Sequence, residues 1–223
     1  MVGTVNTRFV LITETNSLFG YEFLHRLLAD ERSNLAAVVT RAPGVLCDYY
    51  LDDDVQVDVA TEARQNGVDV YQPENPNASE IVEAMRALAP DYIIVANYQL
   101  QVGREPRDVP AVDILNFHPS PLPRYAGLAP YYWMAQNHEA QGGVSAIRMS
   151  AGLDDGPLIA QQLLSLRGDE TPDEVRASHF GASWRLFDLV LPTLHARTYR
   201  SWPQDLSLRT YYGAPPQRVL TTA

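Results

Sequence analysis

The sequence predicts an α/β fold, in which a Rossmann-like, doubly wound and mostly parallel sheet carries a short C-terminal appendage. Short apolar, β-rich runs alternate with segments of helical periodicity along the first half of the chain. Most of these runs are apolar throughout, which is typical of strands covered by helices on both faces of a sheet. Hydrophobic residues make up 46% of the 223 residues, enough to build a substantial core. We expect one main domain over residues 1–198 and a tail over residues 199–223.

The first half of the chain supplies four of the expected strands and three of the expected helices. Gly67 is typical of the residue that ends a helix, and Pro90 stops the third helical pattern. The acidic stretch 41–56 has neither periodicity and is expected to form a surface loop. The strands are expected at Phe9–Ile12, Leu35–Val39, Val68–Tyr71 and Tyr92–Ala96, and the helices around Phe23–Leu28, at Val59–Asn66 and around Ile81–Leu88.

The second half of the chain continues the sheet and ends in a long helix. That helix is expected to begin at Thr171, because Thr171, Pro172 and Glu174 form a capping box with proline in the first helical position. The residues after it are rich in proline and aromatic side chains. The further strands are expected at Ile114–Phe117, Gly143–Met149 and Leu158–Leu166, with a proline-rich segment at His118–Pro130 and a helix at Tyr131–Asn137 between them.

Charge and composition exclude several classes of function. The formal net charge is −10, which disfavours nucleic acid as a partner because phosphate contacts dominate that affinity. The sequence contains no lysine, so all 17 basic residues are arginine. Lysine Schiff-base chemistry, a P-loop lysine and a kinase lysine are therefore excluded.

The sequence is expected to belong to a cytoplasmic protein. It contains no apolar run of the ~18 residues needed to cross a bilayer, so no membrane association is expected. Its N-terminal residues lack the pattern of a secretory signal. Cys47 is the one cysteine, which rules out an intrachain disulfide and agrees with a reducing compartment.

Asn116 and His118 are the first candidates for a functional site. They alternate at the end of an expected strand, so their side chains point to the same side of the sheet. Ligands bind parallel sheets just beyond the carboxyl ends of the strands. The plain alternative is a polar strand end followed by a proline loop.

The sequence lacks the motifs of several other kinds of site. No G-x-G-x-x-G follows the first strand, no G-x-S-x-G is present, and the five histidines lack metal-site spacing. No metal is therefore expected.

A second block, Ala151–Pro157, is by itself an ordinary Asp-Gly turn between two strands. Together with the first block, however, the stretch Asn116–Gln161 resembles the folate-dependent formyltransferases. Their pattern is roughly N-x-H-P-S-L-L-P-x-Y-R-G, then G-V-T, then L-D-x-G. It corresponds here to Asn116–Gly127, Gly143–Ser145 and Leu153–Gly156, and Pro90–Tyr98 is similar to the segment before the family's folate loop. The sequence departs from the pattern at Pro121, Ala126 and Ser145, none of which removes a catalytic atom.

The resemblance implies a chemistry and a set of site residues. The formyl donor is 10-formyltetrahydrofolate, and an amine attacks it directly through an oxyanion intermediate, with Asn116, His118 and Asp154 as catalytic residues. Asp155 takes the variable position of the turn. The resemblance implies folate contacts from Asn97, Tyr98, Gln99, Leu100, Val102, Gly152 and Leu153, and acceptor contacts from Arg124, Tyr125, Tyr211 and Tyr212.

The acceptor is expected to be a small amine, and a nucleotide-linked amino sugar is favoured. The chain is expected to be too short to carry the RNA-contacting domain of a tRNA formyltransferase. The resemblance also implies that Glu14 lies where a glycinamide ribonucleotide transformylase would bind phosphate. Arg209–Pro215 resembles the tyrosine-rich segment of the amino-sugar enzymes. The alternatives are that transformylase, a 10-formyltetrahydrofolate hydrolase, or a folate-binding domain. The tail is expected to bind the acceptor or to form a homodimer.

Overall fold

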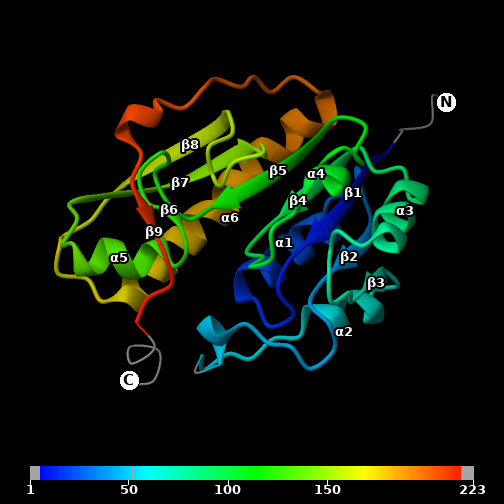
Figure 1. The fold of residues 1–223 in the computed structure, drawn as a ribbon, viewed down its shortest axis with the longest axis horizontal. Coiled ribbons are helices and arrows are strands. Elements are labelled where there is room, and N and C mark those ends of the chain that lie inside the picture. The colour runs from blue at the N-terminus through cyan, green and yellow to red at the C-terminus, as the bar shows by residue number, and fades with distance from the viewer. Residues whose placement is uncertain (1–5, 52, 217–223) are drawn as a thin grey trace. The chain divides into compact units, whose positions relative to one another are not determined.

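The computed structural model describes residues 6–51 and 53–216 (Figure 1). Its main sheet has seven strands in the order β3-β2-β1-β4-β5-β7-β8. Strand β1 pairs in parallel with β2 and with β4, β2 pairs in parallel with β3, and β7 pairs antiparallel with β8. The predicted α/β fold with a mostly parallel sheet is confirmed. The chain divides into two compact units after Leu115, and each is described by itself.

The N-terminal unit is built as the apolar runs predict. All four residues from Phe9 to Ile12 in β1 are fully buried, and β4 is buried along its whole length. Ser17 and Asp58 cap two helices, because their side chains accept hydrogen bonds from backbone N–H groups in the first turn. The unit contains β1 (Thr7–Ile12), α1 (Leu18–Ala29), β2 (Ser33–Val39), a 3₁₀ turn η1 (Asp48–Tyr50), α2 (Val59–Gln65), β3 (Asp69–Tyr71), α3 (Ser79–Ala87), β4 (Tyr92–Val95) and α4 (Arg104–Arg107).

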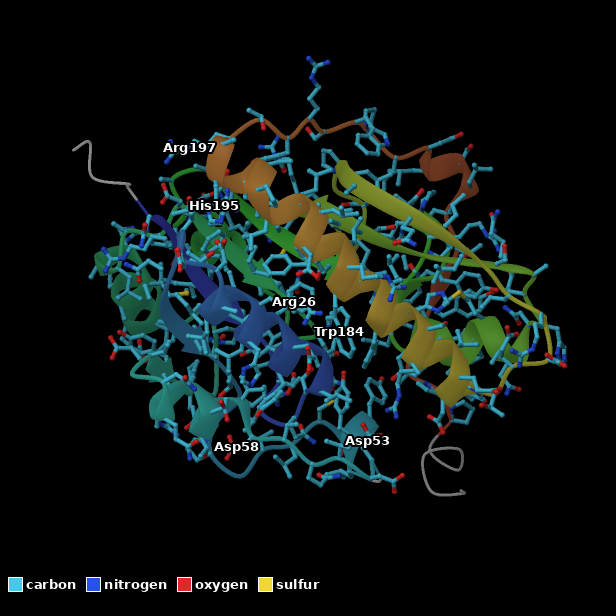
Figure 2. All side chains as sticks on the ribbon, turned by 180° about the vertical axis from the view of Figure 1, so that it is seen from behind. Arg26, Asp53, Asp58, Trp184, His195 and Arg197 are labelled. Carbon is cyan, nitrogen blue, oxygen red and sulfur yellow. The ribbon has the colours of Figure 1, made fainter. Side chains whose placement is uncertain are left out.

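The C-terminal unit places one long helix, α6, against β7 and β8. In Figure 2 this helix runs across the near side of the strands, with Trp184 and His195 on it and Arg197 at its end. The predicted capping box at Thr171 is present. Strand β5 begins just before the division, and the elements are β5 (Asp113–His118), β6 (Ala126–Gly127), α5 (Pro130–Gln136), β7 (Gln141–Arg148), β8 (Leu158–Ser165), α6 (Pro172–Ala196), a 3₁₀ turn η2 (Leu206–Leu208) and β9 (Tyr211–Tyr212). Within the described residues, no helix is both long and apolar enough to cross a membrane.

A small second sheet joins the end of the chain to the proline-rich segment. Strands β6 and β9 pair in parallel, with Ala126 opposite Tyr211 and Gly127 opposite Tyr212. The Leu128 N–H donates to the Tyr212 carbonyl at 2.9 Å. Two-residue strands have no periodicity, so this pairing could not be expected from the sequence.

His179 fixes α6 to β7 and makes stability depend on pH. Its side chain is fully buried, its Nε2 accepts the Gly143 N–H at 3.1 Å, and its Nδ1 lies 2.8 Å from the Val175 carbonyl. Both partners are satisfied by a neutral ring with its proton on Nδ1. Burial lowers the pKa of His179 to about 4, below the ordinary 6.5, while the Val175 hydrogen bond pulls it the other way.

We expect this pKa to make the protein less stable in mild acid. The contribution of His179 to stability is complete above pH 6.5, where this histidine is neutral in the folded and in the unfolded state. It is lost as the pH falls from 6.5 towards 4, because the unfolded state then binds a proton that the folded state does not bind. The loss amounts to about 3 kcal/mol. Urea unfolding between pH 4 and pH 7.5 measures this loss. As the pH is lowered, the free energy of unfolding should fall more steeply for the parent protein than for His179→Gln. His138→Asn removes an exposed histidine of the same unit and is the control. Equal slopes for the parent and His179→Gln would contradict the prediction.

Candidate active site

Asn116, His118 and Asp154 meet within the C-terminal unit. Asn116 and His118 lie on the last residues of β5, and Asp154 lies in the turn between β7 and β8. The Asn116 Nδ2 donates to Asp154 Oδ1 at 3.3 Å, and His118 Nδ1 lies 3.9 Å from the same oxygen. The side chains of His118 and Asp154 are each only 9% exposed. The fold therefore brings the three predicted catalytic side chains together, with Asn116 and His118 beside the Asp154 carboxylate.

The two neighbouring aspartates of the turn face different groups. The second oxygen of Asp154 accepts the Gly127 N–H at 2.9 Å, and Asp154 has φ 53° in the left-handed region. Asp155 instead accepts a hydrogen bond from the Ser150 hydroxyl. Its carboxylate also lies so close to Gly152 that a Cβ there would come within 1.9 Å of Oδ2. Asp154 is thus the aspartate that faces Asn116 and His118.

The His118 ring is held through one nitrogen and leaves the other beside Asp154. Nε2 lies 3.0 Å from the Tyr125 carbonyl, which can only accept, so Nε2 carries a proton. Nδ1 then has a lone pair in the neutral ring and a second N–H in the imidazolium form. This arrangement lets the ring gain or give up a proton at Nδ1 without losing its orientation.

The proline-rich segment that follows His118 is fixed from β7 and β8. The buried Ser145 hydroxyl donates to the Ser120 carbonyl at 2.8 Å and accepts the Leu122 N–H at 3.1 Å. The Gln161 Nε2 donates to the Leu122 carbonyl at 2.7 Å and to Ser145 Oγ at 2.9 Å. The Leu122–Pro123 peptide bond is cis. Ser145 therefore supplies a hydroxyl at the position where the family pattern has threonine.

The predicted folate loop, Asn97–Val102, follows β4 in the N-terminal unit. Asn97 has φ 58°, and its side-chain amide donates to Tyr50 Oη at 2.8 Å. The Gln99 N–H donates to Glu14 Oε1 at 2.8 Å. Burial raises the pKa of Tyr98 to about 12, so its phenol stays protonated at neutral pH. The loop is thus fixed at its start to η1 and to the end of β1, and Val102 is buried at its other end.

Leu100 lies at the centre of that loop and is partly exposed. None of the hydrogen bonds among the described residues uses its N–H or its carbonyl. In the C-terminal unit, the predicted folate contacts Gly152 and Leu153 are exposed, and the Leu153 side chain is 52% exposed.

Glu14 is a buried carboxylate at the end of β1. It is fully buried, and its Oε1 lies 3.4 Å from Arg41 Nη1. Its Oε2 has no hydrogen-bond partner among the described residues. Burial raises the pKa of Glu14, while the Gln99 N–H and the Arg41 charge pull it down. The end of β1 thus places a buried carboxylate beside this loop.

The four predicted acceptor residues differ in how open they are. Arg124 pairs with Glu139 at 2.7 Å, and the Tyr125 hydroxyl donates to Glu139 at 2.6 Å. Tyr125 is 2% exposed and stacks on Tyr212, with 4.9 Å between ring centroids. Tyr211 is 53% exposed. Tyr125 and Tyr212 therefore pack within the unit, and Tyr211 offers the most open ring of the three tyrosines.

Two residues that touch the Asp154 turn were not among the predicted site residues. The Gln204 Nε2 donates to the Asp154 carbonyl at 2.9 Å, and the Arg209 Nη2 donates to the Leu153 carbonyl at 3.0 Å. Gln204 is 50 positions away from its partner, and no sequence pattern marks it. Across the described part of the chain, no group of three or more His, Cys, Asp or Glu side chains could hold a metal ion.

Comparison with known proteins gives a family and several relatives. The family model described as formyl transferase matches residues 7–185. A methionyl-tRNA formyltransferase of Geobacter metallireducens is 33% identical over 67% of this chain and 48% of its own length. One from Methylacidiphilum infernorum is 28% identical over 86% of this chain and 60% of its own length. The chain thus spans about half of the length of the curated relatives it matches.

Solved structures share the fold at low sequence identity. An N-formyltransferase from Helicobacter canadensis, crystallised with folinic acid and dTDP-3-aminofucose, has a TM-score of 0.69 and 19% identity, over 92% of this chain and 70% of that chain. Glycinamide ribonucleotide transformylase 1 from Symbiobacterium toebii has a TM-score of 0.69 and 22% identity, over 91% of this chain and 96% of that chain. At these identities the likeness concerns the fold.

Proposed function

The chain belongs to the formyl transferase family, and we propose that it transfers a formyl group from 10-formyltetrahydrofolate to the amine of a small acceptor. One observation carries this proposal: a single carboxylate, Asp154, contacts Asn116, His118 and the Gly127 N–H. Two hydrogen-bond donors beside a carboxylate are what acyl transfer to an amine requires.

The roles of the three side chains follow from their positions. The folate substrate supplies an activated formyl group. As the acceptor nitrogen bonds to the formyl carbon, negative charge develops on the formyl oxygen. Asn116 donates a hydrogen bond to this oxygen, and the His118 ring donates a second one when Nδ1 carries a proton. Asp154 receives the proton that the amine loses, directly or through a water molecule. The bond from the formyl carbon to the folate nitrogen then breaks, and that nitrogen takes up a proton.

We further propose that each of the two predicted folate segments, one in the N-terminal unit and one in the C-terminal unit, offers groups that suit the donor. The unused N–H and carbonyl of Leu100 suit hydrogen bonding to a heteroaromatic ring, and the exposed Leu153 side chain suits apolar contact with it. The first segment is held in shape by the contacts of Asn97, Tyr98 and Gln99. In the second segment, Gly152 is exposed and has no side chain that would cover the backbone. Arg124 and Tyr125 would then support the acceptor side from within the unit.

A nucleotide-linked amino sugar is the acceptor we favour. The buried Glu14 carboxylate at the end of β1 disfavours a phosphate at that point, which argues against glycinamide ribonucleotide. The net charge of −10 disfavours tRNA, the acceptor that the curated relatives' names carry. The open Tyr211 ring can stack on a nucleotide base. We also propose that the protein acts in the cytoplasm, and that the tail predicted over residues 199–223, of which 217–223 lie outside the described residues, contributes to the acceptor site or to a homodimer.

A formyl-transfer assay with a panel of acceptors tests the proposal. Purified protein is incubated with 10-formyltetrahydrofolate and, separately, with a dTDP-linked amino sugar, glycinamide ribonucleotide, methionyl-tRNA or no acceptor. Turnover is expected with the amino sugar, and release of free formate without an acceptor should be far slower. Asp154→Asn serves as the blank. Turnover with glycinamide ribonucleotide or methionyl-tRNA alone would overturn the acceptor, and fast formate release with no acceptor would identify a hydrolase.

A further inference from the structure

The segment after α6 holds the turn that carries Asp154. The side-chain amide of Gln204 donates two hydrogen bonds, to the Asp154 carbonyl at 2.9 Å and to the Gly156 carbonyl at 2.7 Å. Arg209 adds a third, to the Leu153 carbonyl at 3.0 Å. Three carbonyl groups within four residues of this turn thus receive hydrogen bonds from one later segment of the chain.

The turn requires such support because its backbone is strained. Asp154 has φ 53°, a conformation that costs a residue with a side chain of the order of 1–2 kcal/mol. Strained residues persist only where their surroundings hold them in place. At the other end of the turn, Gly156 packs so tightly that a Cβ would lie 1.8 Å from the Arg148 carbonyl oxygen. The position of the Asp154 carboxylate therefore depends on what holds the backbone on both sides.

Gln204 is suited to this task by its chemistry. Carbonyl oxygens can only accept hydrogen bonds, and a side-chain NH₂ group has two N–H donors, so it can hold both carbonyls at once. The Gln204 Oε1, by contrast, has no hydrogen-bond partner among the described residues. The contacts of Gln204 are thus directed at the backbone of the Asp154 turn.

We propose that Gln204 is a positioning residue for Asp154, with Arg209 as a second support. By holding the turn, it keeps the carboxylate against the Gly127 N–H and beside Asn116 and His118. The catalytic part of this inference rests on the proposed formyl transfer. The positional part does not, because the Gly127 hydrogen bond reports on Asp154 directly.

The test is Gln204→Met, which keeps the length of the side chain and removes both donors. We expect kcat to fall about 10- to 100-fold, because a misplacement near 1 Å can cost about 100-fold. The amide ¹H and ¹⁵N shifts of Gly127 should move in the direction seen for Asp154→Asn. The control is Gln162→Met, the same change in β8, at a side chain that makes none of the hydrogen bonds described here. It should leave the rate and the Gly127 shifts unchanged.

A second variant keeps the test decisive if Gln204→Met does not fold. Gln204→Glu retains the shape, but an ionised carboxylate cannot donate to the two carbonyls. Its kcat relative to the parent should rise as the pH is lowered, because protonation restores one donor.

Gly127 shifts that stay at their parent values in Gln204→Met would overturn the proposal, whether or not activity falls. A kcat within about twofold of the parent would overturn the catalytic consequence. If instead the Gly127 shifts move as expected but the parent protein transfers no formyl group, the proposed function fails and the positioning role stands.

Discussion

Asp154→Asn is expected to fold normally and to lower kcat for formyl transfer by at least ~100-fold, the scale of losing a general base or an oxyanion-stabilising group. Asparagine has the size of aspartate and tolerates the left-handed backbone at φ 53°. Its carbonyl oxygen can still accept the Gly127 N–H. The variant therefore removes the negative charge and the proton acceptor, and its NH₂ group in the place of Oδ1 cannot accept the Asn116 hydrogen bond. The KM for the folate donor should change little, because that ligand is expected to bind through backbone groups.

Asp155→Asn is the matched control, since the same substitution is made one residue away. The Asp155 carboxylate accepts from Ser150, and an asparagine oxygen can do the same. Most of the activity should remain. Steady-state rates of the two variants, measured in one assay, show which aspartate the reaction requires. Unfolding curves show whether both variants are folded. An inactive Asp155→Asn beside an active Asp154→Asn would reverse the assignment, and full activity in both would remove Asp154 from the mechanism.

His118→Asn extends the same comparison. It removes the ring whose Nδ1 lies 3.9 Å from Asp154, and a similar loss in kcat is expected. Residues that act as a unit are far from additive, so the double variant should be scarcely slower than either single variant. Losses that multiply in the double variant would mean that the two side chains act independently.

The sequence predicts those features of the fold that depend on local pattern. Continuous apolar runs such as Tyr92–Val95 predicted buried strands, and the alternation of Asn116 and His118 placed both side chains on one side of β5. Local pattern does not predict which aspartate lies beside them, because the turn alone gives no reason to prefer Asp154 to Asp155. In the sequence, only the family resemblance distinguished the two. The structure adds the physical difference, which is that Asp155 faces Ser150 and Asp154 faces Gly127.

Contacts between segments far apart in the chain could not be predicted. The pairing of β6 with β9 brings together residues 85 positions apart through two-residue strands that have no periodicity of their own. The Gln204 side chain belongs to a proline-containing segment with no helical or strand pattern. Hydrogen bonds of this kind depend on where the chain returns after α6, which tertiary packing decides. The positions of Tyr211 and Tyr212, which are predicted to contact the acceptor, depend on the same return, so their exposure could not be predicted from the sequence.

Gly127→Ala is expected to destabilise the C-terminal unit by about 4 kcal/mol and to lower kcat as well. Gly127 has φ 102°, which favours glycine, and an added Cβ would lie 2.1 Å from the Tyr212 carbonyl oxygen. The backbone strain costs about 2 kcal/mol. Displacement of β9 would also weaken the Leu128 N–H bond to Tyr212 and the Gly127 N–H bond to Asp154, at about 1 kcal/mol each.

Gly168→Ala separates the backbone strain from the steric clash. Gly168 lies in the same unit with φ 86°, but the nearest atom to an added Cβ is the His138 carbonyl oxygen at 3.2 Å. This variant should therefore lose only about the 2 kcal/mol that backbone strain costs, and it should retain its activity. Urea unfolding and steady-state rates on the two variants give the comparison. Because the Gly127 N–H holds the Asp154 carboxylate, the excess destabilisation of Gly127→Ala should be accompanied by lost turnover. Equal destabilisation of the two variants, with activity kept in both, would mean that the β6–β9 pairing yields without moving Asp154.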